Sequence, residues 1–401
     1  MRIIVETAAE EMPPILDAAW RDPTTFALLP ARTPVSNAWV RAGLEQLPPS
    51  MQSDHFALLS SGSTGHPTLV IGSRTRAERL ARTLHIQQQS DPVLTTPLSL
   101  PLSYSYAFVN QWLWATVHDR QLVAGGGFQY PGVLEQTLMG AENAMLCLVG
   151  AQASLLVKFF EGMSFPGVIR LHFAGGPFPG HRLDAIRQLF PNAIVFNNYG
   201  CVEAMPRLTI RVIGTSHEPT DIGRPIPGVE LKTDSEGNLL FRSPFGAVAF
   251  YDDDGIRLVG DSQYIATGDR GERADDGSWR LMGRNNEIFK RYGEKIALPG
   301  LLKTVFGVWR GSAAFYRETD GFGEAAHVLV LAPTPDDGDL RSVLQAFRKN
   351  YPRTHWPLRV ESLESLPLKE NGKVDVTALT THRDRHVHWS QRIESCQTST
   401  S

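Results

Sequence analysis

The hydrophobic pattern in the middle of the chain alternates between short apolar runs and apolar positions spaced for a helix. The runs at 169–173 and 193–196 predict two strands. Between them, Leu183, Ile186 and Phe190 recur at the spacing of one helix face. Strand, helix and strand in succession predict a parallel sheet covered by helices, and therefore an α/β fold.

The most apolar stretch of the chain covers residues 144–160. Within it, Ala153, Leu156, Val157 and Phe160 follow the spacing of a single helix face. The stretch is shorter than the roughly 20 residues that a helix needs to cross a bilayer. We therefore expect a helix in the protein core, and no membrane partner.

The composition of the sequence changes after residue 221: Gly, Pro and Asp interrupt short apolar runs up to residue 284. This pattern predicts a small β-rich subdomain with tight turns. Later runs at 313–316 and 326–331, followed by a helical pattern, predict a small α+β domain. The expected division is a large N-terminal domain with mostly parallel sheets at 1–285, a C-terminal domain at 286–380 and a disordered tail at 381–401.

Composition narrows the class of protein. The chain has 401 residues, of which 42% are hydrophobic and 20% charged, with a formal net charge of −3. This balance argues against nucleic acid as a partner, since phosphate binding needs a concentrated basic face. Three widely spaced cysteines and a charged start without an apolar core predict neither disulfides nor export, so we expect a cytoplasmic protein. The histidines near the end are incidental in this interpretation, and no structural metal is expected.

A loop rich in Ser, Thr and Gly follows the strand-like run 56–59. Hydroxyl groups and backbone N–H groups in such a loop cradle phosphate oxygens. The same composition is also typical of a plain linker. No Gly-Lys-Ser/Thr follows, so the loop is not a Walker A loop. The candidate phosphate contacts are Ser60, Ser61, Gly62, Ser63, Thr64 and Gly65.

The loop SSGSTGHP at 60–67 closely resembles the signature loop of the adenylate-forming superfamily, which includes acyl-CoA synthetases, aryl-CoA ligases, peptide-synthetase adenylation domains and luciferases. Further motifs resemble that family in the family's order: LPLSYSY at 100–106, AGGP at 174–177, NNYGCVE at 197–203, YIATGD at 264–269, GRNNEIFK at 283–290 and LPLKENGKVD at 366–375. The resemblance covers about 56–375, with a shorter N-terminal region than family members usually carry. It departs from the family pattern at Thr68, Val202 and Asn286, where the family usually has Lys, Thr and Asp.

The resemblance implies an AMP-forming acid–thiol ligase that uses ATP and Mg²⁺. In that family, the residue matching Tyr199 offers its ring to adenine, and an amide such as Asn197 pairs with the adenine edge. Asp269 would accept the ribose hydroxyls, and Glu203 would hold Mg²⁺ against the ATP phosphates. The remaining nucleotide contacts that the resemblance implies are Gly175, Gly176, Gly200 and Arg284.

The resemblance also implies that the C-terminal domain is mobile. Lys373 would stabilise negative charge between the carboxylate and the α-phosphate during adenylation. The domain would then rotate at Asn286, and Gly293 would meet the thiol acceptor.

The acyl substrate and the acceptor stay open. The pocket candidates are Tyr104, Tyr106, Asn110 and Gly175, and the two tyrosines favour an aryl or a short to medium acyl acid. The acceptor is either coenzyme A or the phosphopantetheine of an acyl carrier protein, and a ligase specific for a carrier protein is one alternative. Because of the three departures, a non-catalytic nucleotide-binding homologue is a second alternative.

Overall fold

The computed structural model describes residues 1–33, 35–60, 67–124, 126–176, 178–214, 218, 220–284, 287–369 and 372–391. The chain separates into two compact units, Met1–Leu281 with Glu370–Gly372, and Met282–Lys369 with Lys373–Ser401. Within the described residues, no helix is both long and apolar enough to cross a membrane.

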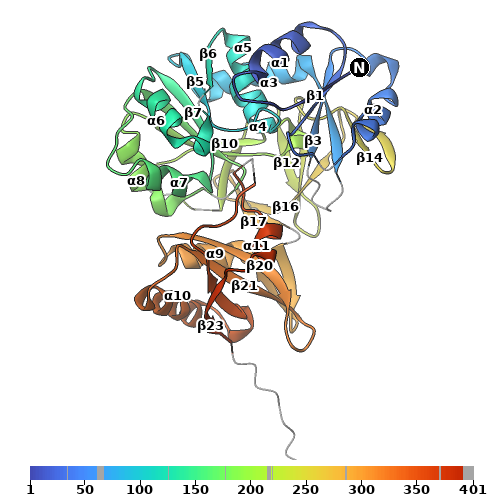
Figure 1. Ribbon diagram of the computed structural model, residues 1–401. Helices are drawn as coiled ribbons and strands as arrows, with labels where there is room; N and C mark the ends of the chain where they lie inside the picture. The colour runs from blue at the N-terminus through green and yellow to red at the C-terminus, as the bar shows by residue number, and fades with distance from the viewer. Residues whose placement is uncertain are drawn as a thin grey trace, which may run out of the picture. The chain divides into compact units, whose positions relative to one another are not determined.

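The first unit contains two large sheets (Figure 1). The six-stranded sheet has the order β1-β2-β3-β4-β14-β15, in which β1 to β3 run parallel. Its strands are β1 (Arg2–Val5), β2 (Phe26–Leu29), β3 (His55–Ser60), β4 (Thr68–Ser73), β14 (Ala249–Asp252) and β15 (Gly255–Leu258).

The second sheet has eleven strands in the order β12-β13-β16-β17-β11-β10-β9-β8-β7-β5-β6. The strands from β9 to β6 are parallel, and β10 runs antiparallel to β9. The bounds of the parallel strands and β10 are β5 (Thr95–Leu98), β6 (Gln121–Ala124), β7 (Ala144–Val149), β8 (Val168–Ala174), β9 (Ile194–Tyr199) and β10 (Thr209–Val212). The β-rich end consists of β11 (Asp221–Pro225), β12 (Glu230–Thr233), β13 (Asn238–Arg242), β16 (Ile265–Arg273) and β17 (Trp279–Arg284).

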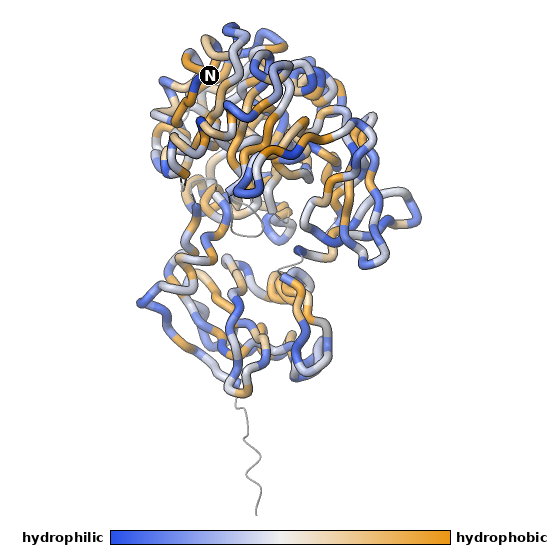
Figure 2. The backbone as a smooth tube through the Cα atoms, turned by 90° about the vertical axis from the view of Figure 1, so that its right-hand side faces the viewer, coloured by the Kyte–Doolittle hydropathy of each residue, from blue (hydrophilic) through white to orange (hydrophobic). Residues whose placement is uncertain are grey.

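Helices cover these sheets in layers, as Figure 1 shows for the first unit. One hydrophobic cluster joins α1 (Met12–Arg21), α3 (Arg74–Gln87) and the helical segments α4 (Ser105–Ala107) and α5 (Trp114–His118) to one face of each sheet. A second cluster packs α6 (Pro131–Met139), α7 (Gln152–Phe159) and α8 (Leu183–Leu189) on the other face of the parallel strands. A third places α2 (Asn37–Glu45) on the remaining face of the six-stranded sheet. The hydrophobic segments therefore lie inside the unit, and the tube in Figure 2 is orange along them.

The second unit has a four-stranded sheet and a two-stranded hairpin. The sheet consists of β20 (Ser312–Thr319), β21 (Ala325–Ala332), β22 (Arg359–Ser362) and β23 (His386–Ser390), and the hairpin of β18 (Ile288–Arg291) and β19 (Glu294–Ala297). The helices α9 (Leu298–Phe306) and α10 (Asp337–Asn350) pack on one face of the sheet, and α11 (Val376–Thr381) belongs to the cluster on the other. This arrangement fits the small α+β domain that the sequence predicts.

Two sequence-based predictions are wrong. Residues 144–160 are not one helix: Ala144–Val149 form a strand, β7, whose six residues are all buried, and the helix is confined to α7. A strand buried on both faces of a parallel sheet is continuously apolar, so the pattern does not distinguish it from a core helix. The tail expected at 381–401 is structured at His386–Ser390, because Trp389 packs against the domain core and β23 pairs with β22.

Candidate active site

The strand β9 carries the nucleotide motif at its carboxyl end, beside the carboxyl ends of β8 and β7. Ligands of open α/β sheets bind at this edge of the strands. The hydroxyl of Tyr199 donates to Oδ2 of Asp269 at 2.6 Å, which ties β9 to β16. The two residues that the sequence assigns to adenine and ribose therefore meet in one place.

The carboxylate of Asp269 is held in a fixed position. It is only 6% exposed, and its backbone N–H donates to Oγ1 of Thr267 at 3.1 Å. Burial is the main cause that raises the pKa of Tyr199, and the negative charge of Asp269 raises it further. The phenol therefore stays protonated and acts as a hydrogen-bond donor. An ionised carboxylate has two oxygens, and each can accept a hydrogen bond from a hydroxyl group.

Asn197 provides an unsatisfied acceptor on the same strand. Its side chain is 4% exposed, and Oδ1 has no hydrogen-bond partner in the part of the chain that the structure describes. A buried amide oxygen without a donor costs free energy, and a ligand N–H at this position removes that cost.

Gly200 is required by close packing with the backbone. A Cβ at this position would lie 1.7 Å from the carbonyl oxygen of Pro206 and 3.0 Å from the Cα of Arg207. In addition, the N–H of Leu208 donates to the carbonyl of Tyr199 at 2.9 Å. These contacts fix the segment 205–208 against the end of β9.

Glu203 lies in the 3-10 turn Val202–Ala204 that follows this glycine. The N–H of Ala247 donates to its backbone carbonyl at 2.9 Å, which anchors the turn. Burial, followed by the charge of Glu203 and then other contacts that include Asp269, raises the pKa of the Cys201 thiol. The carboxylates of Glu203 and Asp269 therefore act on the same small region of the site.

No group of three or more His, Cys, Asp or Glu side chains that could hold a metal ion occurs among the described residues. Glu203 therefore has no set of protein ligands beside it there. It fits a Mg²⁺ ion whose other ligands are phosphate oxygens and water, which is how Mg²⁺ is usually held.

Three of the pocket candidates follow β5: Tyr104 immediately precedes α4, and Tyr106 and Asn110 lie in the helical segment that begins there. Tyr106 is 3% exposed and Asn110 is 1% exposed, while Tyr104 is half-buried with its ring centroid 6.2 Å from that of Tyr106. Residues Phe108–Leu113 form a π-helical turn, a feature that is frequent at functional sites because it redirects side chains.

An N-terminal carboxylate anchors the loop before this segment. Glu6 accepts hydrogen bonds from the backbone N–H of Leu102 and from the N–H (3.3 Å) and the hydroxyl of Ser103. The N-terminal region therefore supports the proposed acyl pocket, although its sequence pattern did not indicate this role.

The structure describes only some of the other residues that are expected to contact the nucleotide. Gly175 (φ 74°) and Gly176 form the turn after β8, and Ser60 ends β3. Ser61, Gly62, Ser63, Thr64 and Gly65 lie outside the described residues, as does Asn286.

Arg284, Gly293 and Lys373 belong to the second unit. Arg284 is exposed, and its N–H donates to Oε2 of Glu287 at 3.0 Å. Gly293 (φ 81°) and Tyr292 (φ 49°) form the two-residue turn of the β18–β19 hairpin. Two central residues with positive φ are typical of a type I′ turn, and a Cβ on Gly293 would meet nothing within 4 Å.

Lys373 lies on a closed loop. Its carbonyl accepts the N–H of Lys369 at 2.8 Å, and Leu368 and Val374 form a β-bridge. Asp375 then caps α11 by accepting the N–H of Ala378 at 3.1 Å. These bonds fix the backbone on both sides of the lysine.

Sequence reasoning missed a set of buried polar side chains below this site. Arg207 donates to Oδ1 of Asn198 at 2.6 Å and to Oδ1 of Asn110 at 2.8 Å. Nothing in the sequence pattern marked Arg207, because a single polar residue after a motif does not indicate which segments it contacts. Its burial could not be read from the pattern.

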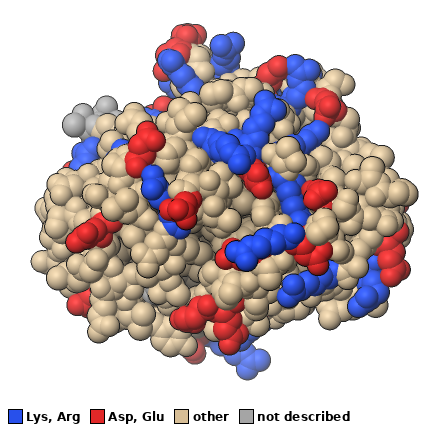
Figure 3. Space-filling model, turned by 90° about the horizontal axis from the view of Figure 1, so that it is seen from above, with Lys and Arg blue, Asp and Glu red and all other residues tan. Residues whose placement is uncertain are grey.

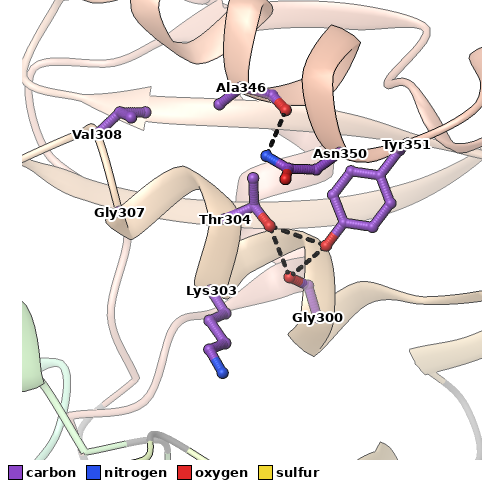
Figure 4. Close-up of a pocket in the computed structure, with 8 residues that line it drawn as sticks. All are labelled: Gly300, Lys303, Thr304, Gly307, Val308, Ala346, Asn350 and Tyr351. Atoms are coloured by element: carbon purple, nitrogen blue, oxygen red, sulfur yellow. Dashed lines mark hydrogen bonds between the residues drawn. The ribbon is translucent and has the colours of Figure 1, made fainter.

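A surface hollow that lies elsewhere is shown in Figure 4. It has a volume of about 580 Å³ and is formed between α9 and α10, where Tyr351 Oη, Thr304 Oγ1 and the Gly300 carbonyl are hydrogen-bonded. None of its lining residues is a candidate site residue, so we do not assign the chemistry to it. On the face shown in Figure 3, basic and acidic side chains are interspersed and form no single basic surface.

The fold and the site define the class of adenylate-forming ligases: a parallel α/β sheet with a tyrosine–aspartate pair at its carboxyl edge and a separate small α+β unit. The AMP-binding enzyme family matches residues 5–247, which is more than half of the chain. The chain belongs to this family of enzymes, and the resemblance found in the motifs is confirmed.

Relatives and solved structures agree with this assignment. The D-alanine–D-alanyl carrier protein ligase of Staphylococcus haemolyticus (strain JCSC1435) is 25% identical over 354 residues, which cover 80% of this chain and 69% of that protein. The ligase of the same name from Staphylococcus aureus (strain Newman) is 24% identical over 241 residues, which cover 55% of this chain and 48% of that protein. The match therefore spans only about half the length of the S. aureus protein.

The predicted fold class is confirmed by similarity to solved structures. The anthranilate CoA ligase AuaEII in complex with anthranoyl-AMP has a TM-score of 0.73 and 16% identity, with 94% of this chain and 82% of that chain covered. The o-succinylbenzoate CoA synthetase (MenE) from Bacillus subtilis, in complex with the intermediate OSB-AMP, has a TM-score of 0.73 and 15% identity, covering 95% and 88% of the two chains. At this identity, these similarities show the fold.

Proposed function

We propose that the protein activates a carboxylic acid with ATP, releases pyrophosphate and transfers the acyl group from the acyl-adenylate to a thiol. The observation that carries this proposal is the Tyr199–Asp269 pair at 2.6 Å, at the carboxyl edge of the parallel sheet. Beside it, on the same strand, stands the buried acceptor of Asn197. The pair offers a carboxylate to ribose hydroxyls, and the amide offers an oxygen to the amino group of adenine.

In this reaction, the carboxylate of the acid attacks the α-phosphorus of ATP, a new C–O–P bond forms and the bond to pyrophosphate breaks. The protein needs no nucleophile of its own, because catalysis consists of positioning the reactants and neutralising charge. Mg²⁺ held by Glu203 would neutralise the phosphate oxygens, as hard oxygen ligands suit this ion. A solved MenE structure from B. subtilis contains ATP and magnesium, which supports the same pair of ligands here.

For the C-terminal unit, we propose the roles that the resemblance implies. Lys373 would stabilise the charge that develops at the α-phosphate, and Asn286 would be the hinge. Gly293 would then lie beside the thiol during thioester formation, and Arg284 would contact the ribose or phosphate. In the first unit, the phosphate loop from Ser60 to Gly65 would hold phosphate oxygens of ATP.

The acceptor is the second part of the proposal. Relatives named D-alanyl carrier protein ligases favour the phosphopantetheine of an acyl carrier protein, whereas the CoA ligases among the solved structures favour coenzyme A. The relatives named for a carrier protein are the ones matched by sequence, so we propose a carrier protein as the acceptor. Incubation of acid and ATP with either acceptor decides between them: acyl-CoA formation without carrier acylation would contradict the choice.

Exchange of labelled pyrophosphate into ATP tests the adenylation step. We expect exchange that depends on both the carboxylic acid and Mg²⁺. Substitution of Asp269 by Ala should abolish it while the melting temperature of the nucleotide-free protein changes by only a few degrees. Exchange that persists in the variant would refute the proposed role of the carboxylate.

A further inference from the structure

A buried arginine without a carboxylate lies below the carboxyl edge of the parallel sheet. Arg207 is 1% exposed, and its two hydrogen-bond acceptors are the amide oxygens of Asn198 and Asn110. Its guanidinium carbon lies 5.7 Å from the ring centroid of Tyr106. Burial lowers the pKa of Arg207, and the groups that oppose this effect are Tyr106 and Cys147. In the described part of the chain, no carboxylate pairs with this cation.

The neighbours of Arg207 do not compensate its charge. Burial raises the pKa of Tyr106, and it raises the pKa of Cys147 to about 11, so both stay protonated and neutral. Burial also lowers the pKa of His172 well below its usual value, so the ring is neutral. His172 joins the cluster because its Nδ1 lies 3.2 Å from Nδ2 of Asn198. The cluster therefore carries a net charge of about one positive unit.

Polar atoms in and beside this cluster are also left without partners. Nε2 of His172 and Oε1 of Gln88 are buried and form no hydrogen bond to any described residue. Gln88 belongs to the same network, because its Nε2 donates to Oδ1 of Asn110 at 3.0 Å. Buried polar groups are normally satisfied, so unpartnered atoms around one cation indicate room for a polar ligand or for water.

The position of the cluster points to the acyl substrate. Cys147 and His172 are register partners on β7 and β8, and Asn198 lies one residue before the end of β9. Arg207 follows Pro206, whose backbone packs against Gly200 of the nucleotide motif. Tyr106 and Asn110 come from the segment after β5. All of these residues lie at or just before the edge where ligands of such sheets bind.

We infer that Arg207 determines the acyl specificity of the enzyme, and that the substrate is an acid whose far end carries an oxygen, a second carboxylate or a hydroxyl. The inference rests on the proposed function, because it assigns the acid that is activated there. The guanidinium donates to that oxygen, and the Nε2–H of His172 and the Gln88 amide oxygen supply a further donor and acceptor. An acid that ends in hydrocarbon leaves these groups unpaired and is rejected.

A purely structural role explains the arrangement less well. Burying a charged group costs free energy unless an opposite charge offsets it, and the acceptors of Arg207 are two neutral amides. Arg74 provides the comparison within this protein, since its guanidinium donates to the backbone carbonyls of Trp20, Asp22 and Thr24, and the charges of Asp54, Asp22 and Glu78 partly offset its burial. Arg207 instead ends among side chains that keep unused donors and acceptors.

Matched acids and two variants test the inference. The acids are benzoate, 4-hydroxybenzoate and benzene-1,4-dicarboxylate, with hexanoate and adipate as an aliphatic pair. The kcat/KM of pyrophosphate release is measured for wild type, Arg207→Met and Arg207→Lys. We expect wild type to prefer at least one oxygenated acid over its hydrocarbon partner by about 10- to 100-fold, and Arg207→Met to lose this preference. Arg207→Lys should keep part of the preference for the dicarboxylates, because the charge remains.

Arg74→Met is the control for general damage to the fold. It should lower the melting temperature without changing the order of preference among the acids. An order that survives in Arg207→Met, or equal use of hydrocarbon and oxygenated acids by wild type, would overturn the inference and leave water as the occupant of the cluster. The ratio of kcat/KM for the hydroxylated acid to kcat/KM for the dicarboxylates identifies whether the pocket binds a hydroxyl group or a second carboxylate.

A binding measurement distinguishes failure of the proposed function from failure of the pocket assignment. The thermal shift of the same acids is recorded without ATP, for wild type and for Arg207→Met. If no acid yields pyrophosphate but an oxygenated acid stabilises wild type and not the variant, the ligase proposal fails and the pocket assignment holds. If no oxygenated acid stabilises wild type more than its hydrocarbon partner, the pocket assignment fails.

Discussion

Gly200→Ala is the substitution whose effect the structure determines most sharply. The added Cβ would lie 1.7 Å from the carbonyl oxygen of Pro206 and 2.6 Å from its carbonyl carbon. Both atoms belong to the backbone, so no side-chain rotation relieves the contact. The segment that carries Arg207 must move away from the end of β9.

The size of the effect follows from this geometry. Overpacking in a dense interior costs about 1–3 kcal/mol and sometimes more, and a backbone contact belongs at the upper end. For a domain of this size, such a cost lowers the melting temperature by roughly 2–10 °C. A displacement of about 1 Å beside reacting groups costs on the order of 100-fold in rate, so pyrophosphate exchange should fall by that factor.

Gly132→Ala is the matched control. It makes the same chemical change at a helical glycine of α6, where a Cβ meets nothing within 4 Å. Alanine in a helix is favourable by roughly 0.5–1 kcal/mol, so this variant should melt at the wild-type temperature or slightly above it and retain full exchange. If Gly200→Ala behaved like Gly132→Ala in both assays, the packing argument for the nucleotide motif would be refuted.

Three further outcomes follow from the same contacts. Asp269→Asn keeps the shape but loses the ionised acceptor, so the KM for ATP should rise about 10- to 100-fold, whereas Tyr199→Phe should raise it less than 10-fold; equal effects in steady-state kinetics would argue against ribose recognition. Burial lowers the pKa of His327 to about 3, below the usual 6.5, so its contribution to stability is present above pH 6.5 and is lost as the pH falls towards 3. Chemical denaturation from pH 7 to 4 should show this loss, with a slope of up to about 1.4 kcal/mol per pH unit that His327→Leu removes; an unchanged slope would contradict the assignment. Glu6→Gln should raise the KM for the acid about 10-fold and leave the KM for ATP unchanged, because Glu6 anchors the loop at 102–103; a change in the KM for ATP alone would contradict that role.

The strands and helices with clear periodicity could be predicted from the sequence. The runs at 169–173 and 193–196 became β8 and β9, and Leu183 and Ile186 lie in α8, whereas Phe190 follows its last residue. The failure at β7 has a physical cause, since complete burial removes the alternation that identifies a strand. The strand β23 was missed because a single edge strand with one packed Trp389 has too few apolar positions to show a pattern.

Only the site residues that lie within recognisable sequence motifs could be predicted. The pairing of Tyr199 with Asp269 agrees with the motif assignments, because both residues stand in recognisable segments. Arg207, Asn198 and Glu6 act through contacts between distant segments, and single polar residues give no signal for such contacts. Their roles depend on which strands end side by side, and this is decided by the tertiary fold.

The role of Lys373 bears most directly on the proposed chemistry, and one comparison of two lysines tests it. Pyrophosphate exchange is measured for wild type, for Lys373→Ala and for Lys369→Ala, the latter an exposed lysine on the same closed loop. We expect a loss of at least about 100-fold for Lys373→Ala and wild-type exchange for Lys369→Ala. Undiminished acid-dependent exchange in Lys373→Ala would contradict the account.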